Sequence, residues 1–471
     1  MIGRVALSGE GMRLGEVGQQ HTSVILVVGS AGTAIDGEFM VTLKLDRADA
    51  HQHFGDDFLD TAAHTPTADI FPSRQQQILS GRRLAAQPVV RASQVARLTI
   101  PQFEVTRRVL FIHSFRGSLT DPASYSAINC RLVGESDLIR VYAEQTVLDG
   151  GPLDSLIAVL TQLADETIGP AVQALVGPVR DVDGDGKLAV VLTSQLGPAD
   201  GALANVHGLT RVNDFRQQVL RPIGNEADVI FLNANLSPGE RLRAVFAHEW
   251  AHAAIFSRRY GGSGGDSEPV PSEDDWLNEA LAHLIEVRAS GSSSNVAHRI
   301  QSFLDRPEAA PLVVRDYYRP EYWRHHGCRG AAFLFLEWCL NQSEPRRIGR
   351  LIDGPSVGVE HLEQATQQSF ENLFRGWTTS LGRKLAASEI AGDETDPGEE
   401  AFRQPALSRP RPQEWKPSQF PSQCKTLRLR GTTATYVRIA LDDAASHWRL
   451  VADAPSECRL QLTVIPVARA R

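Results

Sequence analysis

Apolar and polar residues alternate at both ends of this chain, a period-two pattern typical of strands with one buried face. Near the start, β-branched runs separated by glycine-rich turns cover residues 24–45. Near the end, the alternation returns in residues 426–429, 436–439, 448–450 and 460–462. The pattern predicts two small all-β domains, one within residues 1–100 and one over residues 422–471.

Two stretches lack any such period. Residues 47–95 are rich in Gln, His, Ala and Ser, and they predict a poorly ordered connector within the N-terminal hundred residues. Residues 392–421 are acidic and rich in proline, which breaks helices, so they predict a linker.

Between these stretches, strand-like and helical patterns follow one another. Apolar residues at spacings of three, four and seven over residues 151–176 predict an amphipathic helix. Short apolar runs predict strands at residues 107–113, 129–133, 138–142, 188–193 and 228–232. We therefore expect residues 101–391 to form one domain with a mixed sheet and helices, in a chain of the α+β class.

Composition narrows the classes of function. The 471 residues include 48 Lys plus Arg and 56 Asp plus Glu, for a formal net charge of −8. This balance provides no global positive field for nucleic acid or anionic lipid. The longest apolar runs are far shorter than the roughly 18–20 residues that a spanning helix needs. We expect no nucleic-acid partner and no transmembrane segment.

The N-terminus and the five cysteines bear on the compartment. No basic stretch followed by an apolar run opens the sequence, so as written it predicts no signal peptide and a cytoplasmic protein. The cysteines form no dense framework. Cys424 and Cys458 flank the predicted C-terminal strands, where they either form a bridge or stay as two reduced thiols.

The most informative stretch is His248-Glu249-Trp250-Ala251-His252. On a helix, His248 and His252 lie one turn apart on one face and can bind a zinc ion together. Glu249 beside them can accept a proton from water. A chance match to this H-E-x-x-H pattern is expected about once in forty chains of this length and composition.

The residues before this motif predict the start of its helix. Ser237 followed by Glu240 matches a capping box, and Pro238 suits the first helical position. A second helix is predicted after Ser272, with an acidic first turn, and it carries Glu279 as the candidate third zinc ligand. His283, one turn later, either supports the ligands through hydrogen bonds or is an ordinary surface histidine.

Together, residues 248–252 and 276–283 resemble the gluzincin metallopeptidases, and more narrowly the hyicolysin family of bacterial neutral metallopeptidases. The likeness covers roughly residues 105–385, although Ala280 stands where a glycine is commoner. It implies a zincin-like catalytic domain, zinc held by His248, His252 and Glu279, and Glu249 as the general base. Because that family is secreted, it also implies export, which the start of this sequence does not predict.

The motif and the resemblance predict a zinc-dependent endopeptidase that acts on protein or peptide substrates. Glu249 would take a proton from the attacking water and pass it to the leaving amine. Two alternatives stay open. One is a catalytically inactive zincin-like scaffold that binds partners, and the other is a zinc amidase that acts on a non-protein substrate.

Two further elements could serve the reaction. Candidate donors to the oxyanion cluster in the segment after the metal helices, at Tyr317, Tyr318, Tyr322, His325 and His326. The strand at residues 228–232 is a candidate for pairing with an extended peptide along a sheet edge.

Asp181, Asp183 and Asp185, followed by Gly186, match the first half of a D-x-D-x-D-G calcium loop. Position twelve of that loop is Leu192 rather than a bidentate Glu. Two alternatives stay open, a Ca²⁺ site and a solvated turn.

Overall fold

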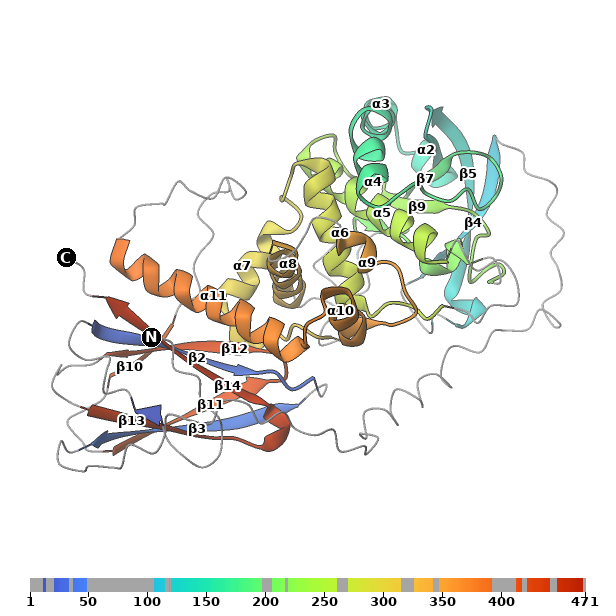
Figure 1. Cartoon of the computed structure of the whole chain (residues 1–471). Helices are drawn as coiled ribbons and strands as arrows, with labels where there is room; N and C mark the ends of the chain where they lie inside the picture. The colour runs from blue at the N-terminus through green and yellow to red at the C-terminus, as the bar shows by residue number, and fades with distance from the viewer. Residues whose placement is uncertain are drawn as a thin grey trace. The chain divides into compact units, whose positions relative to one another are not determined.

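The computed structural model of the chain describes residues 12–13, 21–33, 37–48, 106–114, 118, 120–196, 206–216, 219–260, 270–314, 326–341, 347–391, 412–416, 422–440 and 447–468. The chain divides into two compact units (Figure 1). The first unit comprises Met1–Ala86, Arg299–Ala331 and Gln368–Arg471, and the second comprises Gln87–His298 and Ala332–Gln367. Within the described ranges, no helix has the length and apolar character needed to cross a membrane.

The first unit contains two four-stranded sheets. In order, one sheet consists of β1 (Met12–Arg13), β13 (His447–Asp453), β3 (Glu38–Ala48) and β11 (Ser422–Arg430). The other consists of β10 (Gln413–Trp415), β12 (Ala434–Ala440), β2 (His21–Ser30) and β14 (Leu460–Ala468). Both β2 and β3 lie between two antiparallel partners from the C-terminal part of the chain.

This pairing corrects the prediction of two separate β domains at residues 1–100 and 422–471. The strands from the two ends of the chain form one unit, because each set covers the strand edges and the apolar face of the other. The predicted linker also needs correction. Residues 413–415 form β10, and Trp415 is buried in the core between the sheets. Nearly all of the predicted connector and the rest of the linker lie outside the described residues.

The central strand β2 explains why its sequence is a continuous apolar run. Val24, Leu26 and Val28 are buried in the core between the two sheets. Ile25 and Val27 point to the opposite face and pack in a second apolar cluster with residues of α11 (Phe370–Ala391). A strand that is buried on both faces carries apolar residues at every position rather than at alternate ones.

The second unit is built on a six-stranded sheet. Its order is β4 (Arg107–His113), β5 (Tyr125–Glu135), β6 (Ile139–Glu144), β7 (Leu188–Thr193), β9 (Val229–Asn233) and β8 (Gly208–Leu209). The three strands β6, β7 and β9 are parallel, and the other pairs are antiparallel. The chain is therefore mixed α/β, which is compatible with the predicted α+β class, and the sheet is mixed, as predicted. However, residues 228–232 do not form an edge strand, because β8 pairs with the outer side of β9.

Helices of the second unit pack against this sheet and against one another. They are α2 (Gln145–Leu148), α3 (Asp154–Leu163), the π-helical turn η3 (Ala164–Ile168), α4 (Gly169–Leu175), α5 (Glu240–Tyr260), α6 (Asp275–Ser290), α9 (Arg347–Arg350) and α10 (Gly358–Thr366), with short 3₁₀ turns η2 (Pro122–Ser124) and η4 (Val212–Phe215). Two helices contain residues of both units, α7 (Ala297–Asp305) and α8 (His326–Asn341). The first unit also contains η5 (Pro307–Ala309) and η6 (Ser456–Cys458).

The predicted helix at residues 151–176 is confirmed as a helical run from Asp154 to Leu175. Its π-helical turn presents Asp165 to the turn between β5 and β6, where the carboxylate accepts hydrogen bonds from the Ser136 hydroxyl and the Leu138 N–H. The helix α5, which carries His248 and His252, begins at Glu240, two residues after Pro238. The Glu240 carboxylate accepts a hydrogen bond from the Ser292 hydroxyl at 2.7 Å, so it connects the start of α5 to the segment after α6.

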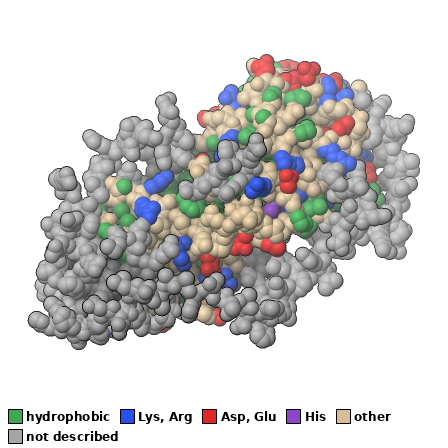
Figure 2. All heavy atoms as spheres, in the orientation of Figure 1, with side chains coloured by type: hydrophobic (Ala, Val, Ile, Leu, Met, Phe, Trp, Pro, Cys, Tyr) green, Lys and Arg blue, Asp and Glu red, His purple; other side chains and the backbone are tan. Residues whose placement is uncertain are grey.

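All five cysteines are free thiols. Cys424 is exposed on β11, and Cys458 is buried at the end of η6. Of the two alternatives for this pair, the structure has the separate thiols. On the face in Figure 2, acidic and basic side chains of the described residues are interspersed, in keeping with the small net charge.

Candidate metal centre

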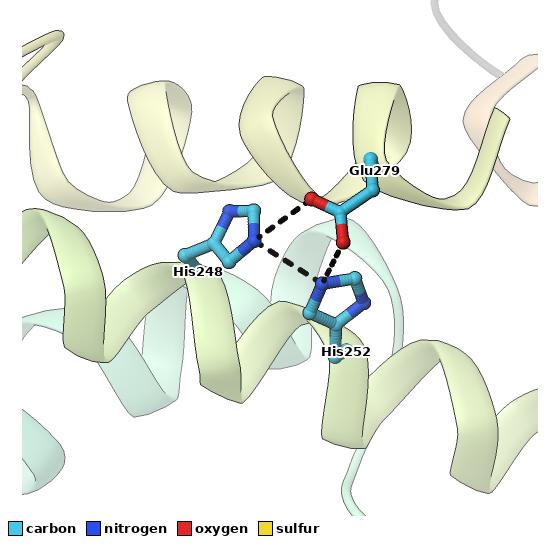
Figure 3. Close-up of side chains that lie close together, drawn as sticks. All are labelled: His248, His252 and Glu279. Carbon is cyan, nitrogen blue, oxygen red and sulfur yellow. Dashed lines mark hydrogen bonds and ion pairs between the residues drawn. The ribbon is translucent and has the colours of Figure 1, made fainter. Parts of the chain in front are cut away.

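Two helices bring the predicted zinc ligands together. His248 and His252 lie one turn apart on α5, and Glu279 points toward them from α6 (Figure 3). The two Nε2 atoms are 3.2 Å apart, and the Glu279 carboxylate oxygens lie 3.5 Å from His248 Nε2 and 3.8 Å from His252 Nε2. Ligand atoms about 2.0–2.1 Å from a tetrahedral zinc ion are roughly 3.3–3.4 Å apart, so this donor set has the spacing of such a site.

The surroundings of these ligands favour a positive charge. Burial alone would lower the pKa of His248, but its hydrogen bonds with Glu279 and Glu286 outweigh burial and raise that pKa to about 10. Two imidazole nitrogens that face each other at 3.2 Å repel unless a proton or a metal ion lies between them. The two histidines and the carboxylate therefore fit a divalent cation of the zinc type.

The side chain of Glu249 extends from α5 and lies against the edge strand β8. This side chain is buried, and the Thr210 hydroxyl donates to its Oε2 at 2.8 Å. The backbone of Gly208 in β8 lies directly against the same carboxylate, since a Cβ at this position would come within 2.5 Å of Glu249 Oε1. Sequence reasoning missed Thr210 and Gly208, because a strand of two residues leaves no readable pattern.

His283 is fully buried, which excludes the alternative that it is a surface histidine. Its Nδ1 lies 2.7 Å from Glu286 Oε2, and the same oxygen lies 3.0 Å from His248 Nδ1 and accepts from Asn295 Nδ2 at 3.0 Å. Burial alone would raise the pKa of Glu286, but the charge of His283 and the hydrogen bond from His248 lower it to about 2. Sequence reasoning missed Glu286, although its place seven residues after Glu279 puts both on one face of α6.

The predicted calcium residues separate in the structure. Asp181 and Asp183 lie close to Asp228, which sequence reasoning missed, and these three carboxylates could hold a metal ion. Asp185 instead forms an ion pair with Arg140 at 2.7 Å, and Arg108 contacts both Asp183 and Asp185. The two arginines pair with Asp183 and Asp185, which favours a turn held by ion pairs. Calcium binding stays a prediction for the group of Asp181, Asp183 and Asp228.

The predicted oxyanion donors Tyr317, Tyr318, Tyr322 and His325 lie outside the described residues. His326 is the first residue of α8 and belongs to the first unit, so the geometry of the second unit does not test its role.

Comparisons with known proteins add no family assignment. No protein-family model matches the chain, and no curated protein matches it. The resemblance to the hyicolysin family therefore stays a prediction, and any function has to be argued from the geometry of the site.

Proposed function

We propose that this chain is a zinc-dependent endopeptidase whose second unit is a zincin-like catalytic domain. The observation that carries the proposal is the convergence of His248, His252 and Glu279 from two packed helices, with Glu249 in the turn between the two histidines. This donor set leaves a fourth tetrahedral position for water or substrate, the arrangement of a catalytic rather than a structural zinc site.

In this proposal the side chains divide the work. Zinc held by the three ligands would supply Lewis acidity, which makes water a stronger acid and a carbonyl a better electrophile. Glu249 accepts a proton from the attacking water and delivers it to the leaving amine. The Thr210 hydroxyl holds one oxygen of Glu249, so the carboxylate keeps a fixed direction.

The edge strand gives the proposal its substrate class. Among the described residues, β8 is the last strand of the sheet and pairs on one side only, with β9. An extended peptide that adds to the other side of β8 would run past Thr210 and therefore past Glu249. Backbone pairing of this kind favours a peptide over a non-protein amide, because it uses the repeating N–H and C=O groups of a main chain.

The test uses the full chain loaded with zinc and an unfolded protein such as casein as substrate. We expect cleavage that a zinc chelator abolishes and added zinc restores. Glu249→Gln should keep one zinc per chain but lose at least about a hundredfold in kcat, because glutamine cannot accept the proton.

Glu240→Gln is the matched control, because Glu240 begins the same helix and contacts Ser292 rather than the metal ligands. It should leave kcat unchanged. Full activity of Glu249→Gln would contradict the mechanism. Zinc binding without any peptide cleavage would favour the scaffold or the amidase instead.

A further inference from the structure

Glu286 lies at the centre of a buried group of polar side chains next to the candidate zinc ligands. Its side chain and that of His283 are fully buried. One carboxylate oxygen, Oε2, lies 3.0 Å from His248 Nδ1, 2.7 Å from His283 Nδ1 and 3.0 Å from Asn295 Nδ2. Donors from α5, from α6 and from the segment after α6 thus meet at a single atom.

These contacts determine which nitrogen of His248 carries a proton. An ionised carboxylate can only accept hydrogen bonds, so the Nδ1 of His248 has to be the protonated nitrogen. The Nε2 of a neutral His248 then presents its lone pair toward His252 and Glu279, 3.2 Å and 3.5 Å away. Rotating the ring by half a turn would break the bond to Glu286 and replace Nε2 with a carbon atom.

A buried carboxylate is costly unless hydrogen bonds satisfy it, so this position of Glu286 needs its three donors. His283 and Asn295 therefore hold Glu286, and Glu286 holds His248. The ring of His283 also lies against the ring of His248, with centroids 4.4 Å apart, which further limits rotation of the ligand.

We propose that Glu286 is a positioning residue of the zinc site, which fixes the tautomer and ring orientation of His248 and thereby strengthens zinc binding. His283 and Asn295 act through Glu286. The inference rests on the zinc binding that we propose above, but it requires no particular substrate and no peptidase activity.

The experiment measures zinc affinity by competition with a chromophoric chelator, using the full chain and no substrate. Glu286→Gln should weaken zinc binding by about 10- to 100-fold, because the amide is uncharged and a poorer acceptor for the His248 N–H. Glu144→Gln is the matched control. Glu144 is also a buried carboxylate of the second unit, but it accepts from Thr193, Ser194 and Gln195. It should keep wild-type affinity.

A second readout is independent of overall stability. In the wild-type protein labelled with ¹⁵N-histidine, His248 should show a protonated Nδ1 in a strong hydrogen bond, and Glu286→Gln should lose that signature. Wild-type zinc affinity in Glu286→Gln would overturn the inference. If this variant does not fold, Asn295→Ala takes its place, with a several-fold loss of affinity expected and an unchanged affinity overturning the proposal.

The outcomes separate the two proposals. If the wild-type chain binds no zinc, the proposed function fails, and the ¹⁵N spectrum still decides whether Glu286 accepts a hydrogen bond from His248 Nδ1. If the wild-type chain binds zinc and Glu286→Gln binds it equally well, only the role of Glu286 fails.

Discussion

Asp228 is a carboxylate that the fold buries just before β9. Its Oδ1 accepts a hydrogen bond from the Val182 N–H at 2.9 Å. Burial raises the pKa of Asp228, the bond from Val182 opposes that rise, and the nearby charge of Asp183 adds to it, so that the pKa reaches about 8. Near neutral pH the folded protein therefore keeps a proton on Asp228 that the unfolded chain has released.

The sign of the pH dependence follows from this difference. Between about pH 4 and 8 the folded state binds more protons at Asp228 than the unfolded state does, so the free energy of unfolding should fall as the pH rises. Asp228→Asn keeps an acceptor for the Val182 N–H and should remove this fall, gaining at least about 1 kcal/mol over the wild type near pH 9. Urea unfolding near pH 4.5, 6.5 and 9 measures the difference.

Equal pH slopes in the two proteins would contradict the prediction. The same measurement with added Ca²⁺ tests the calcium alternative. A calcium-dependent gain in wild-type stability that Asp228→Asn loses would identify Asp181, Asp183 and Asp228 as a calcium site, in which Asp228 is ionised.

Among single residues, the sequence predicted the site residues whose partners lie one helical turn away on the same helix. His248 and His252 are one turn apart on a helix, so their spacing alone placed them on one face. Glu286 was missed because its partner His248 lies 38 residues before it, on another helix. Asn295 was missed because it reaches Glu286 from the segment after the end of α6. A pattern within one element carries no information about a contact that only packing creates.

Among the elements, the two-residue strand β8 positions the candidate general base Glu249. Gly208 allows the strand to approach Glu249, and Gly208→Ala would place a methyl group where the carboxylate now lies. We expect this variant to keep its zinc affinity and to lose about tenfold or more in kcat, because a displacement of about 1 Å in a catalytic group can cost about a hundredfold. Zinc competition and peptide cleavage, measured on the same preparation, check both parts.

Gly150→Ala is the matched control, because Gly150 is exposed and a Cβ there would come no closer than 3.3 Å to the Val147 carbonyl oxygen. It should behave as the wild type. An active Gly208→Ala would mean that Glu249 can work from a different position. The sequence assigned the edge to residues 228–232 because alternation identifies strands but not their order in a sheet.

In the whole molecule, strands from the two distant ends of the chain form one β unit. Lys44 on β3 lies directly opposite Cys424 on β11 in the antiparallel register, and both are exposed. Lys44→Cys should therefore form a disulfide with Cys424 under mild oxidation, because opposite residues in such a pair have their Cα atoms within bridging distance. Peptide mapping without reduction detects the bond.

Met40→Cys is the control, since Met40 lies on the same strand opposite Arg428 and is 52% exposed. It should not react with Cys424. If both variants stay reduced, or if both form the bond equally, the register between β3 and β11 is wrong. Alternation in the sequence predicted these strands but placed them in two separate domains, because pairing between residues 38–46 and 422–430 leaves no local signal.

The layout of the first unit also sets the order in which the protein can fold during synthesis. The strands β2 and β3 leave the ribosome before their partners, because β3 ends at residue 48 and β11, its first antiparallel partner, begins only at residue 422. At about 5–20 residues per second, that delay is roughly 20 to 75 s. Through that interval neither of the described partners of β2, β12 and β14, has been synthesised, so the apolar run of β2 stays exposed for longer when translation is slow, and a chaperone that covers it would favour correct folding.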